Sequence, residues 1–165
     1  LEQGPQSLHL WLEDEAGNIG VQNLVTKQVK FDSEPPTGEV DIENGEATTN
    51  SLSVELSLLA SDPGADRSPG SGSGVTGVTL SNDGDHWSQP REYKNTLSWS
   101  LYGYGGDTSA GIKKIWARFY DGAGNSSKAV SDSIEYEIPQ APQAVIQENS
   151  GTPHDGQIDR MRAFP

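Results

Sequence analysis

The stretch that decides the fold is Ile115-Trp116-Ala117-Arg118-Phe119-Tyr120-Asp121-Gly122-Ala123-Gly124-Asn125. Its first half alternates, with Ile115, Ala117 and Phe119 at every second position, as in a strand that turns one face to a core. Its second half holds turn formers, since Asp and Asn side chains bind turn amides and Gly adopts positive φ at low cost. The stretch therefore predicts a core strand that ends in a tight turn.

The same turn occurs earlier in the chain as Asp14-Glu15-Ala16-Gly17-Asn18, 107 residues upstream. Apolar residues flank both turns at matching places: Leu8, Leu10, Leu12, Val29 and Phe31 in the first copy, and Ile115, Ala117, Phe119, Ile134 and Tyr136 in the second. The period is close to the roughly 100 residues of an immunoglobulin-like sandwich. A repeat of this length predicts an array of similar units.

Short alternating runs separated by Gly, Asn and Asp turns fill the rest of the chain, and no segment has a helical pattern. We predict an all-β fold, an antiparallel immunoglobulin-like β-sandwich of about seven strands. Proline-rich stretches mark its limits. Residues 1–32 are predicted to be the C-terminal hairpin of a preceding repeat, 33–138 a complete sandwich, and 139–165 a linker or the start of a following module.

Composition narrows the function. The formal net charge is −13, and such a surface repels phosphate backbones and anionic headgroups, so we expect no nucleic-acid partner. No apolar run is long enough for direct membrane insertion. The chain has no Cys, so its stability does not depend on disulfides.

Two sets of residues resemble bacterial immunoglobulin-like repeats. The first runs from Pro35-Pro36-Thr37-Gly38 through Ile42 and Asn44-Gly45 to the alternating Val54, Leu56 and Leu58. The second contains Leu80-Ser81-Asn82-Asp83-Gly84, Trp87, Tyr93, Trp99, Leu101, Phe119 and Ala123-Gly124-Asn125. This resemblance implies a tandem module of a large extracellular or cell-surface protein, with a structural or adhesive role in a stalk or filament and no catalytic residues.

Calcium is the one cofactor that the residues suggest. Asp32 and Glu34 lie beside the predicted joint, and Asp14 and Asp121 each begin a repeated turn. Ca²⁺ takes about 6–8 oxygen ligands, which irregular loops can supply. The alternative is that Asp14 and Asp121 only accept hydrogen bonds from turn amides and that Asp32 and Glu34 are solvated.

An alternative function is a carbohydrate-binding accessory module. If Ile115 and its neighbours face the core, Trp116 and Tyr120 face outward, and Trp11 occupies the outer face of the first copy. Surface glycans stack on flat aromatic faces of this kind. Trp87 and Trp99 are expected in the core instead.

Catalysis is not expected. His9, His86 and His154 are far apart in the sequence, and none has a partner at metal-ligand spacing. Gly72–Gly77 matches the dinucleotide-binding glycine pattern but precedes a strand in an all-β context, so we interpret it as a linker.

The predicted hairpin in residues 1–32 needs a partner, because an isolated hairpin is marginally stable in water. Its face is formed by Leu8, Leu10, Leu12, Val29 and Phe31. We expect this face to be covered by residues 139–165, by a neighbouring repeat, or by a copy of the same chain through strand complementation.

Overall fold

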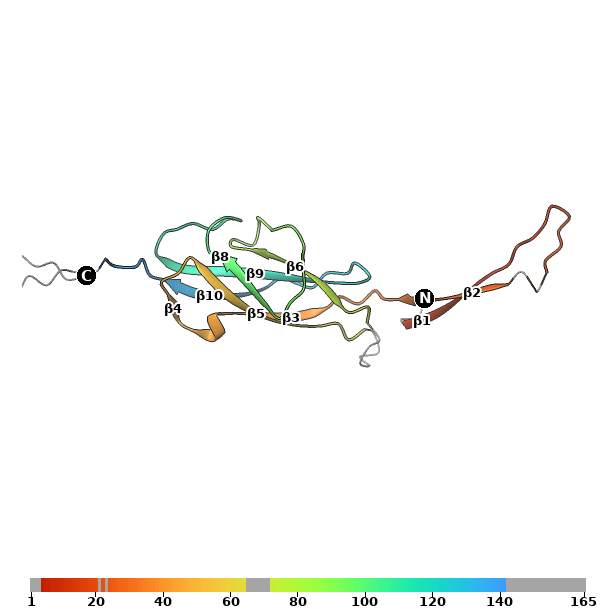
Figure 1. Ribbon diagram of the computed structural model, residues 1–165, viewed down its shortest axis with the longest axis horizontal. Helices are drawn as coiled ribbons and strands as arrows, with labels where there is room; N and C mark the ends of the chain where they lie inside the picture. Colours follow the sequence, from red (N-terminus) through yellow and green to blue (C-terminus); the bar gives the residue numbers. More distant parts are fainter. Residues whose placement is uncertain (1–3, 21, 23, 65–71, 142–165) are drawn as a thin grey trace, which may run out of the picture.

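The computed structural model describes residues 4–20, 22, 24–64 and 72–141. A β-sandwich forms the body, and a two-stranded hairpin extends from one of its ends (Figure 1). The chain leaves the sandwich after β10 at the opposite end (Figure 1). Within the described residues, no helix is long and apolar enough to cross a membrane.

The sandwich consists of two sheets. The order in the larger sheet is β4-β10-β9-β6-β7, and the order in the smaller is β3-β5-β8. The bounds are β3 Thr37–Ile42, β4 Thr48–Thr49, β5 Ser53–Ser61, β6 Val75–Ser81, β7 Arg91–Glu92, β8 Thr96–Ser100, β9 Gly111–Asp121 and β10 Val130–Tyr136. Every pairing is antiparallel except that of β4 with β10. This all-β immunoglobulin-like architecture is the predicted fold class.

The core lies between the two sheets and follows the alternation of the strands. Leu56 from β5, Trp99 from β8 and Phe119 from β9 are 0%, 3% and 0% exposed. The remaining buried apolar residues are Val40, Ile42, Val54, Leu58, Val78, Leu80, Leu101, Ile115, Ala117, Ile134 and Tyr136. Burying a side chain such as Leu or Phe contributes about 1.5–3 kcal/mol, so these residues supply most of the driving force for folding.

Asn82 closes one end of the core. Its side chain accepts a hydrogen bond from the Trp99 indole at 2.8 Å and donates to the carbonyls of Ser100 and Gly103. Trp87, which was expected in the core, is instead half-buried, with the Arg118 guanidinium 4.5 Å from its ring centroid. The indole faces the outer side of the larger sheet, where Arg118 also projects.

Glu43–Gly45 form a single 3₁₀ turn between β3 and β4. All three residues have positive φ, and the first two are not glycine. Hydrogen bonds from Glu55 N to the Glu43 carboxylate and from the Ser57 hydroxyl to the Asn44 amide oxygen hold this backbone in place. The turn leads the chain from one sheet to the other.

The hairpin consists of β1 (Gly4–Leu10) and β2 (Val25–Phe31). Its register repeats that of β9 and β10: Gly4 pairs with Phe31 as Gly111 pairs with Tyr136, and Leu10 pairs with Val25 as Ala117 pairs with Val130. The bridge between Glu13 and Ile19 likewise corresponds to that between Tyr120 and Ser126. The two hairpins therefore share one design in structure as well as in sequence.

The two hairpins differ in whether a second sheet packs on their apolar face. Leu8, Leu10 and Leu12 are 58%, 57% and 63% exposed, whereas their equivalents Ile115, Ala117 and Phe119 are fully buried. The smaller sheet covers the β9–β10 hairpin, and nothing among the described residues covers the apolar face of β1–β2. Of the segment 139–165, only 139–141 lie within the described residues, and they are at the opposite end of the sandwich (Figure 1).

Candidate functional site at the joint

The chain enters the sandwich through a joint formed by residues 32–36. Asp32 is 7% exposed, and its carboxylate accepts hydrogen bonds from the amides of Ser73 at 2.6 Å and Glu34 at 3.2 Å. Pro36 is fully buried and fixes the backbone before β3. The joint is thus anchored by a buried charge and a rigid ring.

The repeated turn binds this joint. Within the turn, the Asp121 carboxylate accepts hydrogen bonds from the amides of Ala123 and Asn125 and from the Asn125 side chain, all at 2.8–2.9 Å. The same Asn125 side chain also donates to the backbone carbonyls of Asp32 and Glu34, at 3.2 and 3.4 Å. The turn therefore attaches the end of the β9–β10 hairpin to the incoming chain.

Three carboxylates meet beside this attachment. Asp32, Asp62 and Asp121 each present an oxygen, and these oxygens all lie within 4.8 Å of one another. Asp121 is 4% exposed. One oxygen of Asp62 accepts from the Gly74 amide at 2.6 Å, whereas the other, Oδ1, is buried without a hydrogen-bond partner among the described residues. An unpartnered buried acceptor costs free energy, which a bound cation would recover.

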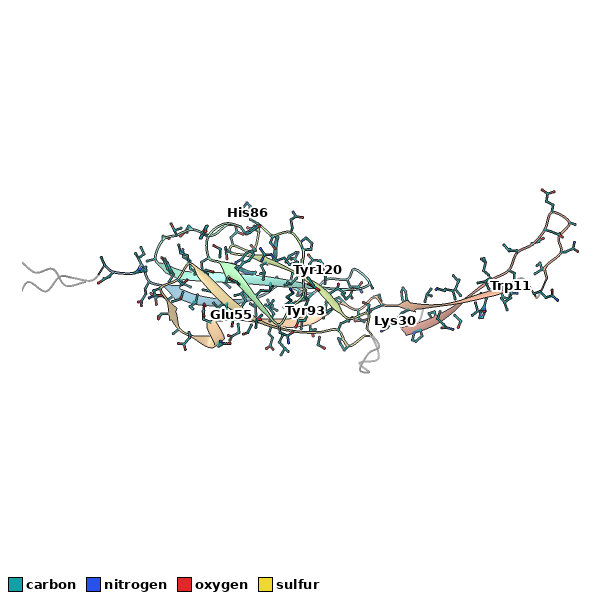
Figure 2. All side chains as sticks on the ribbon, viewed as in Figure 1. Trp11, Lys30, Glu55, His86, Tyr93 and Tyr120 are labelled. Carbon is teal, nitrogen blue, oxygen red and sulfur yellow. The ribbon has the colours of Figure 1, made fainter. Side chains whose placement is uncertain are left out.

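Lys30 brings a positive charge from the end of β2 (Figure 2). Its ammonium donates to the carbonyl of Gly72 and acts on Asp32 electrostatically. Burial alone would raise the pKa of Asp32, but the hydrogen bonds from Ser73 and Glu34 and the charge of Lys30 outweigh it and hold this pKa below its ordinary value. Asp32 is therefore ionised at neutral pH.

The donor set fits a hard cation. Ligands of Ca²⁺ lie about 2.3–2.6 Å from the ion, so two oxygens of one site are at most about 5 Å apart. The 4.8 Å limit of the Asp32, Asp62 and Asp121 oxygens meets this condition.

The structure brings together two of the four residues predicted as metal ligands, Asp32 and Asp121. Glu34 contributes its backbone to the joint, and its side chain is exposed. Asp14 is at the exposed tip of the hairpin, where it accepts from the amides of Ala16 and Asn18. Those hydrogen bonds lower its pKa, the Asn18 side chain contributing most.

Sequence reasoning missed Asp62, Ser73 and the linker-binding role of Asn125. Asp62 follows directly after β5 and precedes a proline, which is a signal for a loop but not for a partner 59 residues away. Asn125 was visible as part of the repeated turn.

The aromatic residues predicted to bind glycans do not form one platform. Trp11 is 50% exposed on the hairpin, far from Tyr120 on the sandwich (Figure 2). Trp116 and Tyr120 are half-buried. The Lys114 ammonium is 4.8 Å from the Trp116 ring centroid, and Gly84 packs against the indole so closely that an added Cβ would be 3.4 Å from it.

Ser81 and His86 each contact Asp83, and this order is wrong for a catalytic triad. The Asp83 carboxylate accepts from the Ser81 hydroxyl at 3.0 Å and contacts His86 Nδ1 at 2.6 Å. A triad requires the histidine between nucleophile and carboxylate. Here Asp83 is central, and the hydrogen bond to it raises the pKa of His86.

Comparisons with known proteins find a likeness to a solved structure. No protein-family model matches the chain, and no curated protein matches its sequence. The PKD1 domain of Epp from Vibrio anguillarum, a crystal structure, is similar with 16% sequence identity and a TM-score of 0.40. The likeness covers 64% of this chain and 98% of that domain.

Proposed function

We propose that this chain is a non-enzymatic structural module of the bacterial immunoglobulin-like type, from a tandem array in an extracellular or cell-surface protein. Its role is to space and orient neighbouring modules in a stalk, filament or adhesin. The observation that carries this proposal is the shared register of the β1–β2 and β9–β10 hairpins, down to the bridge beside each repeated turn. Two hairpins of one design within 165 residues are what two successive modules would supply.

We further propose that Ca²⁺ binds Asp32, Asp62 and Asp121 and stiffens the joint. Asp32 follows the hairpin directly, whereas Asp62 follows β5 and Asp121 is the last residue of β9, both in the sandwich. An ion shared by the three carboxylates would therefore hold the start of the joint against the sandwich. The Lys30 ammonium acts electrostatically on Asp32, so the ion has to compete with it for this carboxylate.

Calorimetric titration of the full chain with CaCl₂ and with MgCl₂ tests the ion. We expect Ca²⁺ uptake with a Kd of about 10⁻⁴–10⁻³ M, as in other extracellular modules. Saturation at 100 times Kd should stabilise the sandwich by about 2.7 kcal/mol. Asp62→Asn should abolish uptake, whereas Asp14→Asn at the distant turn should leave it unchanged. No heat and no change in Tm at about 10 mM Ca²⁺ would exclude the ion.

Small-angle scattering tests the orienting role separately. In the proposed array, the hairpin keeps a narrow range of angles to the sandwich, and Asn125→Ala should widen that range because the side chain no longer binds the linker carbonyls. Asn18→Ala is the matched control at the other turn. If the two variants scatter identically to the wild type, the joint has no orienting role.

The glycan alternative rests on Trp11, the one candidate with a largely exposed ring. A glycan array probed with the full chain and with Trp11→Ala would test it. Binding that is lost in this variant would support a carbohydrate-binding module, and an array without signal would remove the alternative.

A further inference from the structure

We propose that the apolar face of the β1–β2 hairpin binds a three-stranded sheet of the β3–β5–β8 kind from a neighbouring module, and that Leu10 and Leu12 prevent it from binding the β3–β5–β8 sheet of this chain. The inference rests on the proposed tandem array and names the partner of its unpaired face. It makes side-chain volume the feature that keeps neighbouring modules from exchanging strands.

The kind of partner follows from the equivalence of the two hairpins. Residues of β9–β10 that face inward are covered by the smaller sheet, and their counterparts on β1–β2 are Leu8, Leu10, Leu12, Val29 and Phe31. Leu8 and Val29 replace Ile115 and Ile134 with side chains of similar size. A face of the same shape, apolarity and register requires the same kind of cover.

That the hairpin cannot bind the smaller sheet of this chain follows from two central inward positions. At one of them the hairpin has a larger side chain than the β9–β10 hairpin, and at the other it has a smaller one. Leu10 corresponds to Ala117 in the strand register. Leu12 lies two residues beyond the end of β1 and corresponds to Phe119 through the 107-residue offset and the equivalent bridges of Glu13 with Ile19 and Tyr120 with Ser126. Ala117 is fully buried, so a leucine there would be overpacked. A leucine in place of Phe119 would leave a void.

Gly38 shows how closely this sandwich is built around Phe119. A Cβ on Gly38 would be 2.4 Å from Cε2 of Phe119, so β3 carries no side chain where the ring passes. The partner sheet of the β1–β2 hairpin faces a leucine at this place and has room for a side chain. Conversely, it needs space opposite Leu10 that this sandwich does not provide opposite Ala117.

Exchange of strands between neighbours is a characteristic error of tandem modules. The two hairpins share turn, register and polarity, so none of those features distinguishes them. The inverted volumes at two adjacent inward positions do distinguish them, and they act only when the sheets close. They disfavour the pairing of the β1–β2 hairpin with the smaller sheet of this chain more than they favour its pairing with the sheet of a neighbouring module.

A duplicated chain tests the proposal. Residues 33–110, which carry β3 to β8, are placed before residue 4 of the full chain, so that the β1–β2 hairpin can complete a second sandwich. We expect this chain to show a single calorimetric unfolding transition, that of residues 33–138. The Leu10→Ala/Leu12→Phe double variant of the duplicated chain should gain a second cooperative transition, with about twice the total unfolding enthalpy.

A reciprocal variant keeps the test informative if the duplicated chain folds poorly. In the original chain, Ala117→Leu/Phe119→Leu transfers the leucine pattern into the sandwich and should lower its Tm by more than 10 °C. Leu10→Ala/Leu12→Phe in the original chain is the matched control and should leave the Tm within 1 °C of the wild type.

Three results would overturn the proposal. The duplicated wild-type chain could gain a second transition as large as that of its double variant, which would show that volume does not discriminate. The second result is that both duplicated chains lack a second unfolding transition, which would show that the hairpin does not accept this kind of sheet. The original chain could sediment as a dimer that Leu10→Lys dissociates, which would make a second copy the occupant. None of these results bears on calcium uptake or on the angle at the joint, so the proposed function is judged separately.

Discussion

The β1–β2 and β9–β10 hairpins have the same strand register and the same turn. The β9–β10 hairpin is part of the core, whereas the apolar face of the β1–β2 hairpin is exposed. Gly17 and Gly124 have φ of 84° and 92°, and Asp14 and Asp121 accept the same pair of turn amides. The geometry of the turn therefore follows the local sequence that the two hairpins share. Burial depends on the sheet that covers it, and so does most of the stabilisation.

The largest contrast is expected from the equivalent core positions. Ile115→Ala should destabilise the sandwich by about 2–5 kcal/mol because it opens a cavity in a closed core. Leu8→Ala should change the free energy of unfolding by less than about 0.5 kcal/mol, as for other exposed substitutions. Urea unfolding of both variants measures the difference. Equal losses would mean that the hairpin face is covered in solution.

Replacing the two turn asparagines should give a smaller difference in stability than replacing the two core-facing residues. Asn125→Ala removes donors to the carbonyls of Asp32 and Glu34, so we expect a loss of about 1–3 kcal/mol in the stability of the sandwich. Asn18→Ala removes only a contact within its own turn and should cost the sandwich nothing measurable. Thermal unfolding with and without Ca²⁺ compares them, and a loss in Asn18→Ala would contradict the independence of the two turns.

The turn glycines provide a comparison of smaller size. Alanine at Gly124 would be held at positive φ at a cost of about 1–2 kcal/mol, with open space around its Cβ. The same change at Gly17 should disturb only the hairpin tip, which hydrogen exchange at Asp14–Asn18 would detect. If Gly124→Ala is neutral in urea unfolding, the turn relaxes without loss and the contact to the joint does not depend on its geometry.

The smallest effect should be the acid response of the joint. Because the pKa of Asp32 is lower in the folded chain, its contribution is fully present above its unfolded pKa of about 3.9 and is lost as the pH falls through the folded value. Stability should therefore decrease below about pH 4 in the wild type. Asp32→Asn should flatten this part of the curve, and an unchanged slope would show that other carboxylates control it.

Strands that face the core were predictable from alternation. Ile115, Ala117 and Phe119 are fully buried, as their spacing predicted, and Trp99 is in the core as expected. β4 and β7 have only two residues each, too few for a periodic signal, and their pairing depends on neighbouring strands. These two strands form only by pairing within the folded sheet, so their sequences alone do not predict them.

The joint was only half predictable for a related reason. Asp32 was identified because it precedes a proline-rich stretch, and Asp121 because it begins a repeated turn. Asp62 gave no such signal, since only the fold carries the loop after β5 to the end of the β9–β10 hairpin. The partial burial of Trp116 has the same origin, because the loop that contains Gly84 packs on a strand face expected to be open.

The parallel pairing of β4 with β10 has a mechanical consequence. The chain enters the sandwich at one end and leaves at the other, so tension applied at these two points runs along the strands (Figure 1). The hydrogen bonds from Glu135 N to Ala47 O and from Glu137 N to Thr49 O then share the load in shear and have to break together rather than one by one. Because β4 is only two residues long, this seam should be the first to yield when the molecule is pulled.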